Sequence, residues 1–394
     1  MAEAGLDPLE INSVQWPVIG SSADLLGNFS NLNNTVNCTL SFGCFFRYPL
    51  VLTIIYCVAY GAVLVVGILG NVCAFVVVMR DKTLHSVYYR FMANLAIADL
   101  LVLIFCLPVT LLGNLFGPWM LGLFLCKAVA YLQGVSVCAS VYTLVAISVE
   151  RFLAICFPLR WQVSARTCRL IICFIWIFSF ILTLPWAFYF RLINIGRTSD
   201  GDQLYVCREI WPTEKMGLTY FIVAHLLLCY ILPLIMIMIS YGFIWYKVWK
   251  RKLPGEGIHY NSVVQRSKIK VVKMLFVVVL AFMISWLPLY AIFSRIKLGD
   301  TIPENSLEEF IIQACAPIAQ WLGASNSCMN PLLYAFFNNK MKKGLVAVLF
   351  GDKCCNNNVS NVLMTSTKNR SLRTLSNKVR GNGSRKNGNK EDAI

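Results

Sequence analysis

The stretch AVAYLQGVSVCASVYTLVAISVER, residues 128–151, decides the fold of this chain. Its first 22 residues carry no charged side chain, and Glu150 and Arg151 then follow side by side. A helix needs about 20 apolar residues to cross the roughly 30 Å hydrocarbon core of a membrane. The stretch therefore predicts a membrane-spanning helix whose charged end lies at one membrane surface.

Stretches of this kind recur along the whole chain. The 394 residues are 58% hydrophobic and only 14% charged, whereas soluble domains carry about a quarter charged residues. Seven runs of at least 21 residues lack charges, apart from Asp99: 48–79, 91–125, 128–149, 170–190, 216–246, 274–294 and 310–339. Buried helices of a soluble protein would not produce seven such runs. We therefore expect an all-α membrane protein, a bundle of seven transmembrane helices.

The distribution of Lys and Arg predicts the orientation of these helices, because cytoplasmic segments carry an excess of both. With the N-terminus outside the cell, 27 of the 35 basic residues fall in cytoplasmic segments. We expect a multi-pass protein of the plasma membrane with an extracellular N-terminus. The net charge of +16 then reflects topology, and it suits a surface that faces anionic lipid rather than nucleic acid.

The segment before the first run is polar and rich in turn residues. Residues 1–47 are expected outside the cell, and three sequons begin within them at Asn28, Asn33 and Asn37. This pattern predicts N-glycosylation. Residues 48–337 then hold the seven spans.

The segments after the last run are basic and polar. Residues 338–355 combine a short amphipathic eighth helix, expected along the inner membrane surface, with Cys354 and Cys355. These thiols are candidates for palmitoylation, and two unmodified thiols are the alternative. Residues 356–394 have the composition of a disordered tail, and their Ser and Thr residues are candidate targets of kinases that lead to arrestin binding.

One ionised side chain lies deep within a run. A charge inside a bilayer is costly, so Asp99 suggests a function. Oxygen-bearing side chains accompany it at inward-facing spacings: Asn71, Ser140, Asn326, Ser327 and Asn330. With Asp99, the last four predict a site for an allosteric sodium ion, and no other cofactor is expected. A polar network that joins the helices is the compatible alternative.

Each run also carries a recognisable marker. In chain order the markers are Gly70-Asn71, Leu95-Ala-x-x-Asp99, Glu150-Arg151-Phe152, Trp176, Pro233 with Tyr241, Phe282 with Trp286 and Pro288, and Asn330-Pro-x-x-Tyr334. Each marker is weak alone, whereas seven in order are specific. Over roughly residues 48–355 the chain resembles the rhodopsin-like (class A) G-protein-coupled receptors. The resemblance implies a signalling receptor and not an enzyme.

The resemblance also implies how the inner end would work. Arg151 would pair with Glu150 in the inactive receptor. On activation it would extend toward Tyr241 and Tyr334 and help form a cavity for a heterotrimeric G protein. Lys268 stands where some family members carry an acid, so Arg151 would lack a second acidic partner there. Three residues would relay movement from the pocket: Pro233, Val141 and Phe282.

At the outer end the resemblance implies a disulfide between Cys126 and Cys207. This bond would tether the second outer loop over the pocket. Cys38 and Cys44 also lie in the expected extracellular segment, and whether they pair stays open, because geometry alone could prevent it.

The residues of the expected pocket suggest a peptide ligand. Gln133 occupies the position of the acid that binds amines in related receptors, and the run 310–339 has no Lys for retinal. Gln133 with Thr110 resembles receptors for amidated peptides, such as those for neuropeptide Y and neuropeptide FF. Six further side chains complete the expected ligand site: Trp119, His225, Trp286, Gln320, Glu209 and Arg295.

Several alternatives remain for the ligand and the function. Stretches 129–133 and 285–295 are similar to arthropod trissin-type neuropeptide receptors, which implies a disulfide-bonded peptide instead of an amidated one. The outer acids would attract a cationic peptide, and Arg295 with Lys297 an acidic one. A receptor for a lipid or other non-peptide ligand is a further candidate. A transporter or channel is another, although one deep charge does not line a polar path.

Overall fold

The structure is a computed structural model of the chain, and it describes residues 46–81, 84–158, 160–197, 202–250, 259–303 and 306–350. For residues 248–250, 259–275, 339 and 350 it describes the backbone alone. Some predicted sites lie outside this part and stay predictions: Asn28, Asn33, Asn37, Cys38, Cys44, Cys354, Cys355, the Ser and Thr residues of the tail, and the side chain of Lys268.

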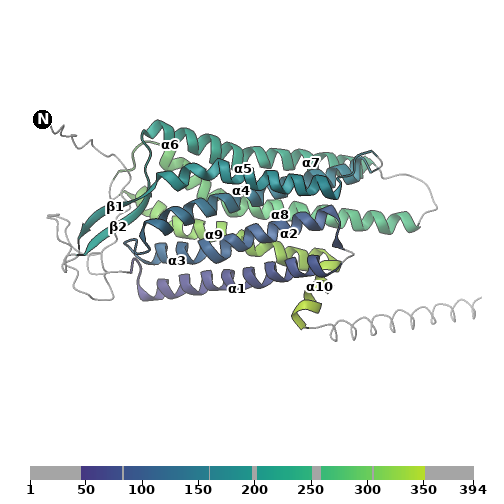
Figure 1. The fold of residues 1–394 in the computed structure, drawn as a ribbon, viewed down its shortest axis with the longest axis horizontal. Helices are drawn as coiled ribbons and strands as arrows, with labels where there is room; N and C mark the ends of the chain where they lie inside the picture. Colours follow the sequence, from purple (N-terminus) through teal and green to yellow (C-terminus); the bar gives the residue numbers. More distant parts are fainter. Residues whose placement is uncertain are drawn as a thin grey trace, which may run out of the picture. The chain divides into compact units, whose positions relative to one another are not determined.

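Helical rods that run side by side dominate the described residues up to 338 (Figure 1). Each rod overlaps with one predicted run. Their parts, in chain order, are α1 (Leu50–Arg80); α2 (Val87–Leu101), η4 (Val102–Cys106) and α3 (Leu107–Leu115); α4 (Gly122–Cys156); α5 (Ala165–Tyr189); α6 (Glu214–Tyr220), η5 (Phe221–Ile231) and α7 (Leu232–Lys250); α8 (His259–Leu298); and α9 (Leu307–Phe337).

Six of the described rods are long and apolar enough to cross a membrane by length and composition. The rod that lies outside this set is α9, although it has 31 residues. Its middle carries Ser325, Asn326, Ser327 and Asn330, which lower its hydropathy. Asn326, Ser327 and Asn330 belong to the predicted ion site, so the composition of α9 reflects a special role inside the bundle.

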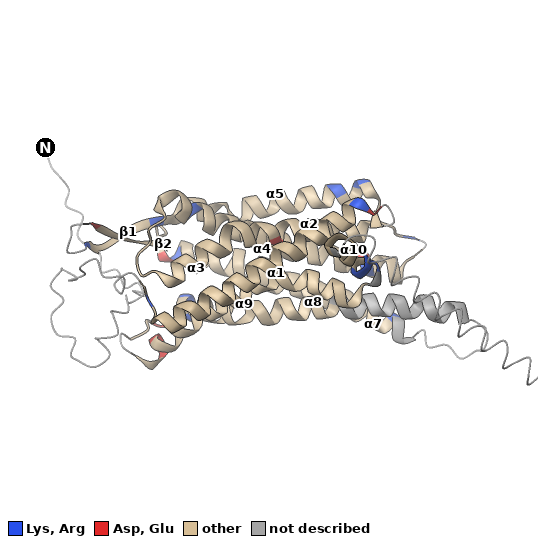
Figure 2. Cartoon of the chain, turned by 90° about the horizontal axis from the view of Figure 1, so that it is seen from below, with Lys and Arg blue, Asp and Glu red and all other residues tan. Residues whose placement is uncertain are grey.

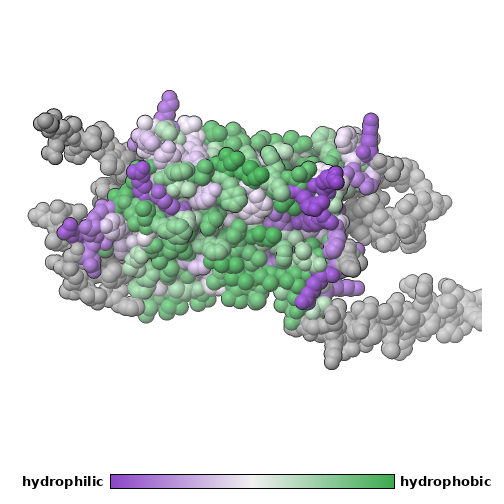
Figure 3. All heavy atoms as spheres, viewed as in Figure 1, coloured by the Kyte–Doolittle hydropathy of each residue, from purple (hydrophilic) through white to green (hydrophobic). Residues whose placement is uncertain are grey.

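Charged residues gather toward the two ends of the bundle (Figure 2), and the face seen in Figure 3 is mostly hydrophobic between them. This is the pattern expected of a protein solvated by lipid along its middle. The centre of the bundle is α4, which packs against α2, α5 and α7. Of the apolar span of α4, 67% is buried, against 17% of that of α5, so α5 presents most of its surface to lipid.

Two π-helical segments interrupt the rods, and each ends two residues before a proline. η4 precedes Pro108, and η5 precedes Pro233. Proline has no N–H to donate and its ring clashes with the carbonyl four residues earlier, so the regular α-helical ladder cannot continue there. The wider π spacing is the local response, and it marks both positions as bends.

A short β-hairpin, absent from the predicted fold, lies between α5 and α6. β1 (Phe190–Arg197) pairs antiparallel with β2 (Gln203–Glu209), with Leu192 opposite Cys207. A register shift between Asn194 and Gly196 bends the hairpin, and Gly196 has a φ of +148° that a residue with a side chain rarely adopts. The predicted long outer loop is therefore an ordered pair of strands.

The helix α10 (Asn339–Phe350) belongs to a separate unit of the chain and forms where the eighth helix was predicted. It carries Lys340, Lys342 and Lys343 in its first half and an apolar second half. Its position along a membrane surface stays a prediction.

Candidate functional site

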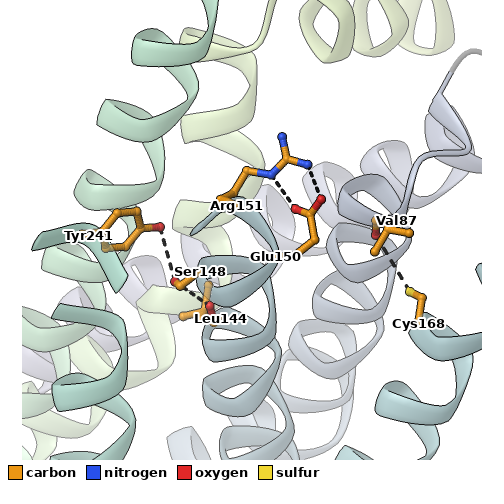
Figure 4. Close-up of polar contacts among 7 residues, drawn as sticks. All are labelled: Val87, Leu144, Ser148, Glu150, Arg151, Cys168 and Tyr241. Atoms are coloured by element: carbon orange, nitrogen blue, oxygen red, sulfur yellow. Dashed lines mark hydrogen bonds and ion pairs between the residues drawn. The ribbon is translucent and has the colours of Figure 1, made fainter. Parts of the chain in front are cut away.

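At one end of the bundle, Arg151 and Glu150 form a bidentate ion pair (Figure 4). The Arg151 Nε lies 2.5 Å from Glu150 Oε2, and Arg151 Nη2 donates to Glu150 Oε1 at 2.6 Å. The two side chains are only 22% and 11% exposed. Two parallel charge-assisted hydrogen bonds in a half-buried place fix the guanidinium more firmly than a surface ion pair would. The predicted pairing is present, and we call it the latch.

An aromatic ring supports the latch from α2. The Arg151 Cζ lies 4.6 Å from the centroid of the buried Tyr88 ring, within the range of a cation–π contact. The Tyr88 hydroxyl is buried without a hydrogen-bond partner among the described residues. Tyr88 therefore holds the guanidinium through its ring face, and it is a site residue that no sequence motif indicated.

The tyrosines expected to receive Arg151 are held elsewhere in this structure. Tyr241 on α7 is buried, and its hydroxyl lies 3.4 Å from the Ser148 hydroxyl (Figure 4). Tyr334 on α9 is also buried, with 2% of its surface exposed. The structure thus shows the paired arrangement of Arg151, and its movement toward the tyrosines stays a prediction. The three relay residues are all buried: Pro233, Val141 and Phe282.

In the middle of the bundle, polar side chains from several helices converge on Asp99. The Asn330 amide donates to Asp99 Oδ2 at 2.8 Å, and the Ser140 hydroxyl lies 3.5 Å from Oδ1. Ser327, one turn before Asn330 on α9, is buried as well. Asn71 on α1 donates to the backbone carbonyls of Gly67 and Ser327, which joins α1 to α9. Asn326 is buried in the same part of α9.

The oxygens of this cluster suit a hard cation such as sodium, because they are carboxylate, hydroxyl and amide oxygens. The packing beside them is close: a Cβ added at Gly70 would lie 2.8 Å from the Cβ of Pro331. Only glycine therefore lets α1 approach the α9 proline next to Asn330. These residues are therefore compatible with both interpretations that the sequence left open: a site for an ion, and a polar network that joins the helices.

At the other end, a disulfide joins α4 to the hairpin, as predicted. The Cα atoms of Cys126 and Cys207 are 5.6 Å apart. The loop before α4 is attached as well, because the Trp119 backbone N–H donates to the Tyr205 carbonyl and its indole N–H donates to the Gly122 carbonyl at 2.9 Å. The hairpin is thus fastened to α4 by a covalent bond and to Trp119 by a hydrogen bond.

Glu209, at the end of β2, connects the hairpin to two rods. Its Oε1 accepts from the indole N–H groups of Trp186 at 3.1 Å and Trp211 at 2.6 Å. Its Oε2 lies 3.2 Å from Lys297 Nζ on α8. Each carboxylate oxygen therefore has a partner before any ligand arrives. Glu209 fastens the hairpin to α5 and α8, and its predicted ligand contact stays a prediction.

Replacing Glu209 by alanine should lower the melting temperature of the purified protein, because it leaves Lys297 and two indoles without their acceptor. The loss should be about 1–3 kcal/mol, the usual cost of unpaired groups of this kind. Glu209→Gln should lose less, since its amide oxygen still accepts. Glu214→Ala, at an exposed acid of α6, is the matched control. Equal melting temperatures for both alanine variants would contradict this role.

Arg295 and Gln320, two further residues of the predicted ligand site, also have partners within the protein. Arg295 pairs with Glu308 across the ends of α8 and α9 at 2.5 Å. With Lys297 bound to Glu209, both bases expected to favour an acidic ligand have acidic partners. The Gln320 amide oxygen accepts from Asn114 at 2.9 Å, and Asn114 also donates to the Tyr60 hydroxyl.

His225 lies in an aromatic cage. Its ring stacks on Trp186 with centroids 4.1 Å apart, and Tyr220 meets it edge-on at 5.0 Å. Its Nε2 is buried without a hydrogen-bond partner among the described residues, and so is the indole nitrogen of Trp286. The Thr110 hydroxyl, by contrast, donates to the Cys106 carbonyl of its own rod. Gln133 is half-buried on α4.

Comparison with known proteins identifies this arrangement. The model of the "7 transmembrane receptor (rhodopsin family)" matches residues 70–334, two-thirds of the chain. The chain belongs to this family. As a rhodopsin-family receptor it is a multi-pass membrane protein and not an enzyme, and α9 is its seventh span, polar where it meets Asp99.

The names of several similar rhodopsin-family receptors state which ligand those receptors bind. The chain is 35% identical to neuropeptide FF receptor 2 of Rattus norvegicus over 74% of this chain and 72% of the relative. It is 32% identical to neuropeptide FF receptor 1 of Homo sapiens over 88% and 80% of the two chains. It is 34% identical to neuropeptide Y receptor type 2 of Sus scrofa over 82% and 83%. The similarity to trissin-type receptors stays a prediction.

Some site residues of this rhodopsin-family receptor were not predicted from the sequence. Tyr88 and Asn114 act through partners on other segments, Trp211 donates to Glu209 two residues before it, and no family marker includes any of the three. Asn114 had a signal, because it is an amide within a charge-free run, where each polar side chain needs a partner. Tyr88 and Trp211 had none, since aromatic residues are common near the ends of membrane helices.

Proposed function

We propose that this receptor binds an extracellular neuropeptide and activates a heterotrimeric G protein, from the plasma membrane and with its N-terminus outside the cell. The observation that carries the proposal is the similarity to receptors for neuropeptide FF and neuropeptide Y, which extends over 74% to 88% of the chain. The latch supports the second part of the proposal, the activation of a G protein. In it, an ion pair with Glu150 holds Arg151, the arginine expected to contact the G protein.

The geometry supports a transfer of movement along the bundle. A ligand under the hairpin would meet His225 and Trp286, whose buried nitrogens are unpartnered. Trp286 lies one turn from Phe282, with ring centroids 6.2 Å apart, and both belong to α8, which Pro288 interrupts. Two packings of bent helices that differ by a few kcal/mol suffice for a switch if the ligand favours one of them.

The direct test is a screen of neuropeptides against cells that express the full chain, with calcium and cAMP as readouts. A peptide that produces a response absent from untransfected cells supports the proposal. Measured ion or substrate flux in proteoliposomes without any G protein would favour a transporter or channel instead. A response to lipids, with none to peptides, would favour a receptor for a lipid.

We also propose that the peptide ends in an amide, recognised by Gln133, which both donates and accepts hydrogen bonds. An amidated peptide should then act at a concentration at least roughly tenfold lower than the same peptide with a free carboxylate, since an unmatched buried polar group costs about 1–3 kcal/mol. Dose–response curves of both forms on the wild type and on Gln133→Ala measure this. Equal potency of both forms on the wild type would refute the amide and leave a disulfide-bonded ligand open.

We propose further that sodium binds at Asp99 and favours the latched arrangement. Asp99, Ser140, Asn326, Ser327 and Asn330 would hold the ion through their oxygens, as in the cluster described above. Replacing Asp99 by asparagine removes the charge and should abolish the decrease in agonist affinity that sodium causes in the wild type. Agonist binding in sodium and in N-methylglucamine buffers measures it. A sodium effect that persists in Asp99→Asn would favour the purely structural network.

The ends of the chain would connect the receptor to its cellular environment. Kinases and arrestin are proposed partners of the tail, and anionic lipid is the proposed partner of the basic inner surface. Cys354 and Cys355 are the proposed sites of palmitoylation. The composition of these segments supports these partners, and labelling with a palmitate analogue of wild type and of a double Cys→Ser variant tests the lipid modification.

A further inference from the structure

Tyr88, the buried aromatic residue beside the latch, has a ring and a hydroxyl group in opposite situations. The residue lies in the first turn of α2, and only 3% of its surface is exposed. The centroid of its ring lies 4.6 Å from the Arg151 Cζ, so the ring has a cationic partner. Its hydroxyl group is buried as well, but it has no hydrogen-bond partner among the described residues. The two parts of this side chain therefore affect the latch differently.

The ring contact adds to the ion pair of the latch and does not compete with it. Arg151 uses Nε and Nη2, at the edge of the guanidinium, for its bonds to Glu150, while the positive charge lies over the Tyr88 ring. The Tyr89 ring meets the Tyr88 ring edge-on at 5.0 Å and limits its movement. A cation–π contact is stronger where both groups are shielded from water, and the Arg151 side chain is only 22% exposed. The ring thus stabilises the latched state.

The hydroxyl group has the opposite effect on the latched state. A buried hydroxyl group without a partner has lost the hydrogen bonds that it would make in water, and this loss is unfavourable. The neighbouring Tyr89 is different, because its hydroxyl accepts from the Asn338 amide at 3.3 Å. Movement of Arg151 out of the latch would open this end of the bundle to water, where the Tyr88 hydroxyl gains a partner. The hydroxyl group therefore favours the open state over the latched state.

We propose that Tyr88 sets the strength of the latch, as a positioning residue for Arg151, through these two opposing contributions. The ring favours the pairing of Arg151 with Glu150, and the hydroxyl group limits its stability. A ligand shifts a two-state equilibrium only by its difference in affinity for the two states, so a latch of limited strength can be opened by a modest difference. The consequence for switching rests on the proposed function, whereas both contributions to the latched state exist without signalling.

Two variants separate the contributions, since Tyr88→Phe removes the hydroxyl group alone and Tyr88→Leu removes the ring as well. In the purified full-length receptor without ligand, Tyr88→Phe should raise the melting temperature by about 2 °C or more, and Tyr88→Leu should melt at least about 2 °C below Tyr88→Phe. Tyr89→Phe is the matched control, because the same change there removes a bonded hydroxyl group and should give no increase. No increase in Tyr88→Phe, or an equal increase in Tyr89→Phe, would overturn the proposal.

The lower melting temperature of Tyr88→Leu could also arise from lost packing, so both Tyr88 variants are measured again together with Arg151→Ala. Without the guanidinium the ring has no cation to stabilise, and the difference between the phenylalanine and leucine variants should fall to about half or less, as expected for coupled residues. Arg151→Gln, which keeps much of the length without the charge, replaces Arg151→Ala if that variant does not fold. An equal difference with and without the guanidinium would overturn the role of the ring.

Ligand-independent nucleotide exchange on purified G proteins extends the test to switching. Tyr88→Phe should lower this exchange at least roughly threefold, because the unmatched hydroxyl group no longer opposes the latch. Tyr88→Leu should raise it above the level of Tyr88→Phe, because the ring no longer holds Arg151. Higher exchange in Tyr88→Phe than in the wild type would overturn the proposal. Melting temperatures that follow the prediction, with no exchange by any variant even with ligand, would support the role of Tyr88 and count against the proposed function.

Discussion

Replacing Arg151 by alanine should abolish ligand-dependent activation of the G protein while ligand binding survives. Arg151 lies at the opposite end of the bundle from the hairpin, and its partners in the structure are Glu150 and the ring of Tyr88. None of these contacts supports the expected ligand pocket. The alanine variant removes the only group expected to leave the latch and reach Tyr241, so the inner cavity would lack its floor in the active state.

Nucleotide exchange on a purified G protein and binding of a labelled ligand, measured on the same membranes, check this result. Exchange should fall to the level without ligand, a loss of at least roughly tenfold, or about 1.4 kcal/mol of coupling free energy. Arg169→Ala, at an exposed base near the start of α5, is the matched control for the lost charge. Ligand-dependent exchange that persists in the Arg151 variant would refute the role of the latch.

The charge-free runs predicted the positions of the helical rods but not their ends. The last run begins at residue 310, whereas α9 begins at Leu307. The Ser306 hydroxyl accepts from the Glu309 backbone N–H, and Glu308 and Glu309 lie in the first turn, where acids favour a helix start. Membrane helices continue past the charged residues at which a charge-free run ends. The charged residues therefore mark the boundary of the lipid, whereas a capping residue such as Ser306 marks the end of the helix.

The predictable parts of the site are those that depend on local sequence. The pairing of Glu150 with Arg151 was implied by the family resemblance, because neighbouring residues on a helix do not face one another by spacing alone. Asp99 was visible as a lone charge in an apolar run. The hairpin and the partners of Glu209 depend on tertiary packing that brings α5, β2 and α8 together. Sequence patterns describe neighbours along the chain, and they carry no signal for contacts of this kind.

Replacing Cys126 by serine should eliminate ligand binding at the cell surface. The disulfide to Cys207 closes a separation of 81 residues, and loss of a native disulfide of this kind costs about 2–5 kcal/mol. Without it, β2 keeps the bond of Tyr205 to Trp119 and the contacts of Glu209, two residues to either side of Cys207. Of these contacts none reaches α4, so β2 would lose its covalent connection to α4 and cover the pocket less firmly.

Surface immunolabelling and ligand binding on intact cells distinguish a loss of binding from a loss of receptor at the cell surface. Cys173→Ser, at an exposed free thiol of α5, is the matched control and should bind like the wild type. Cys207→Ser should reproduce the Cys126 variant, and the double variant should be no worse than either, because one bond is lost in all three. Full binding by any of them would refute a binding role for the disulfide. A double variant much weaker than the single ones would show that each cysteine acts separately, because a shared bond can be lost only once.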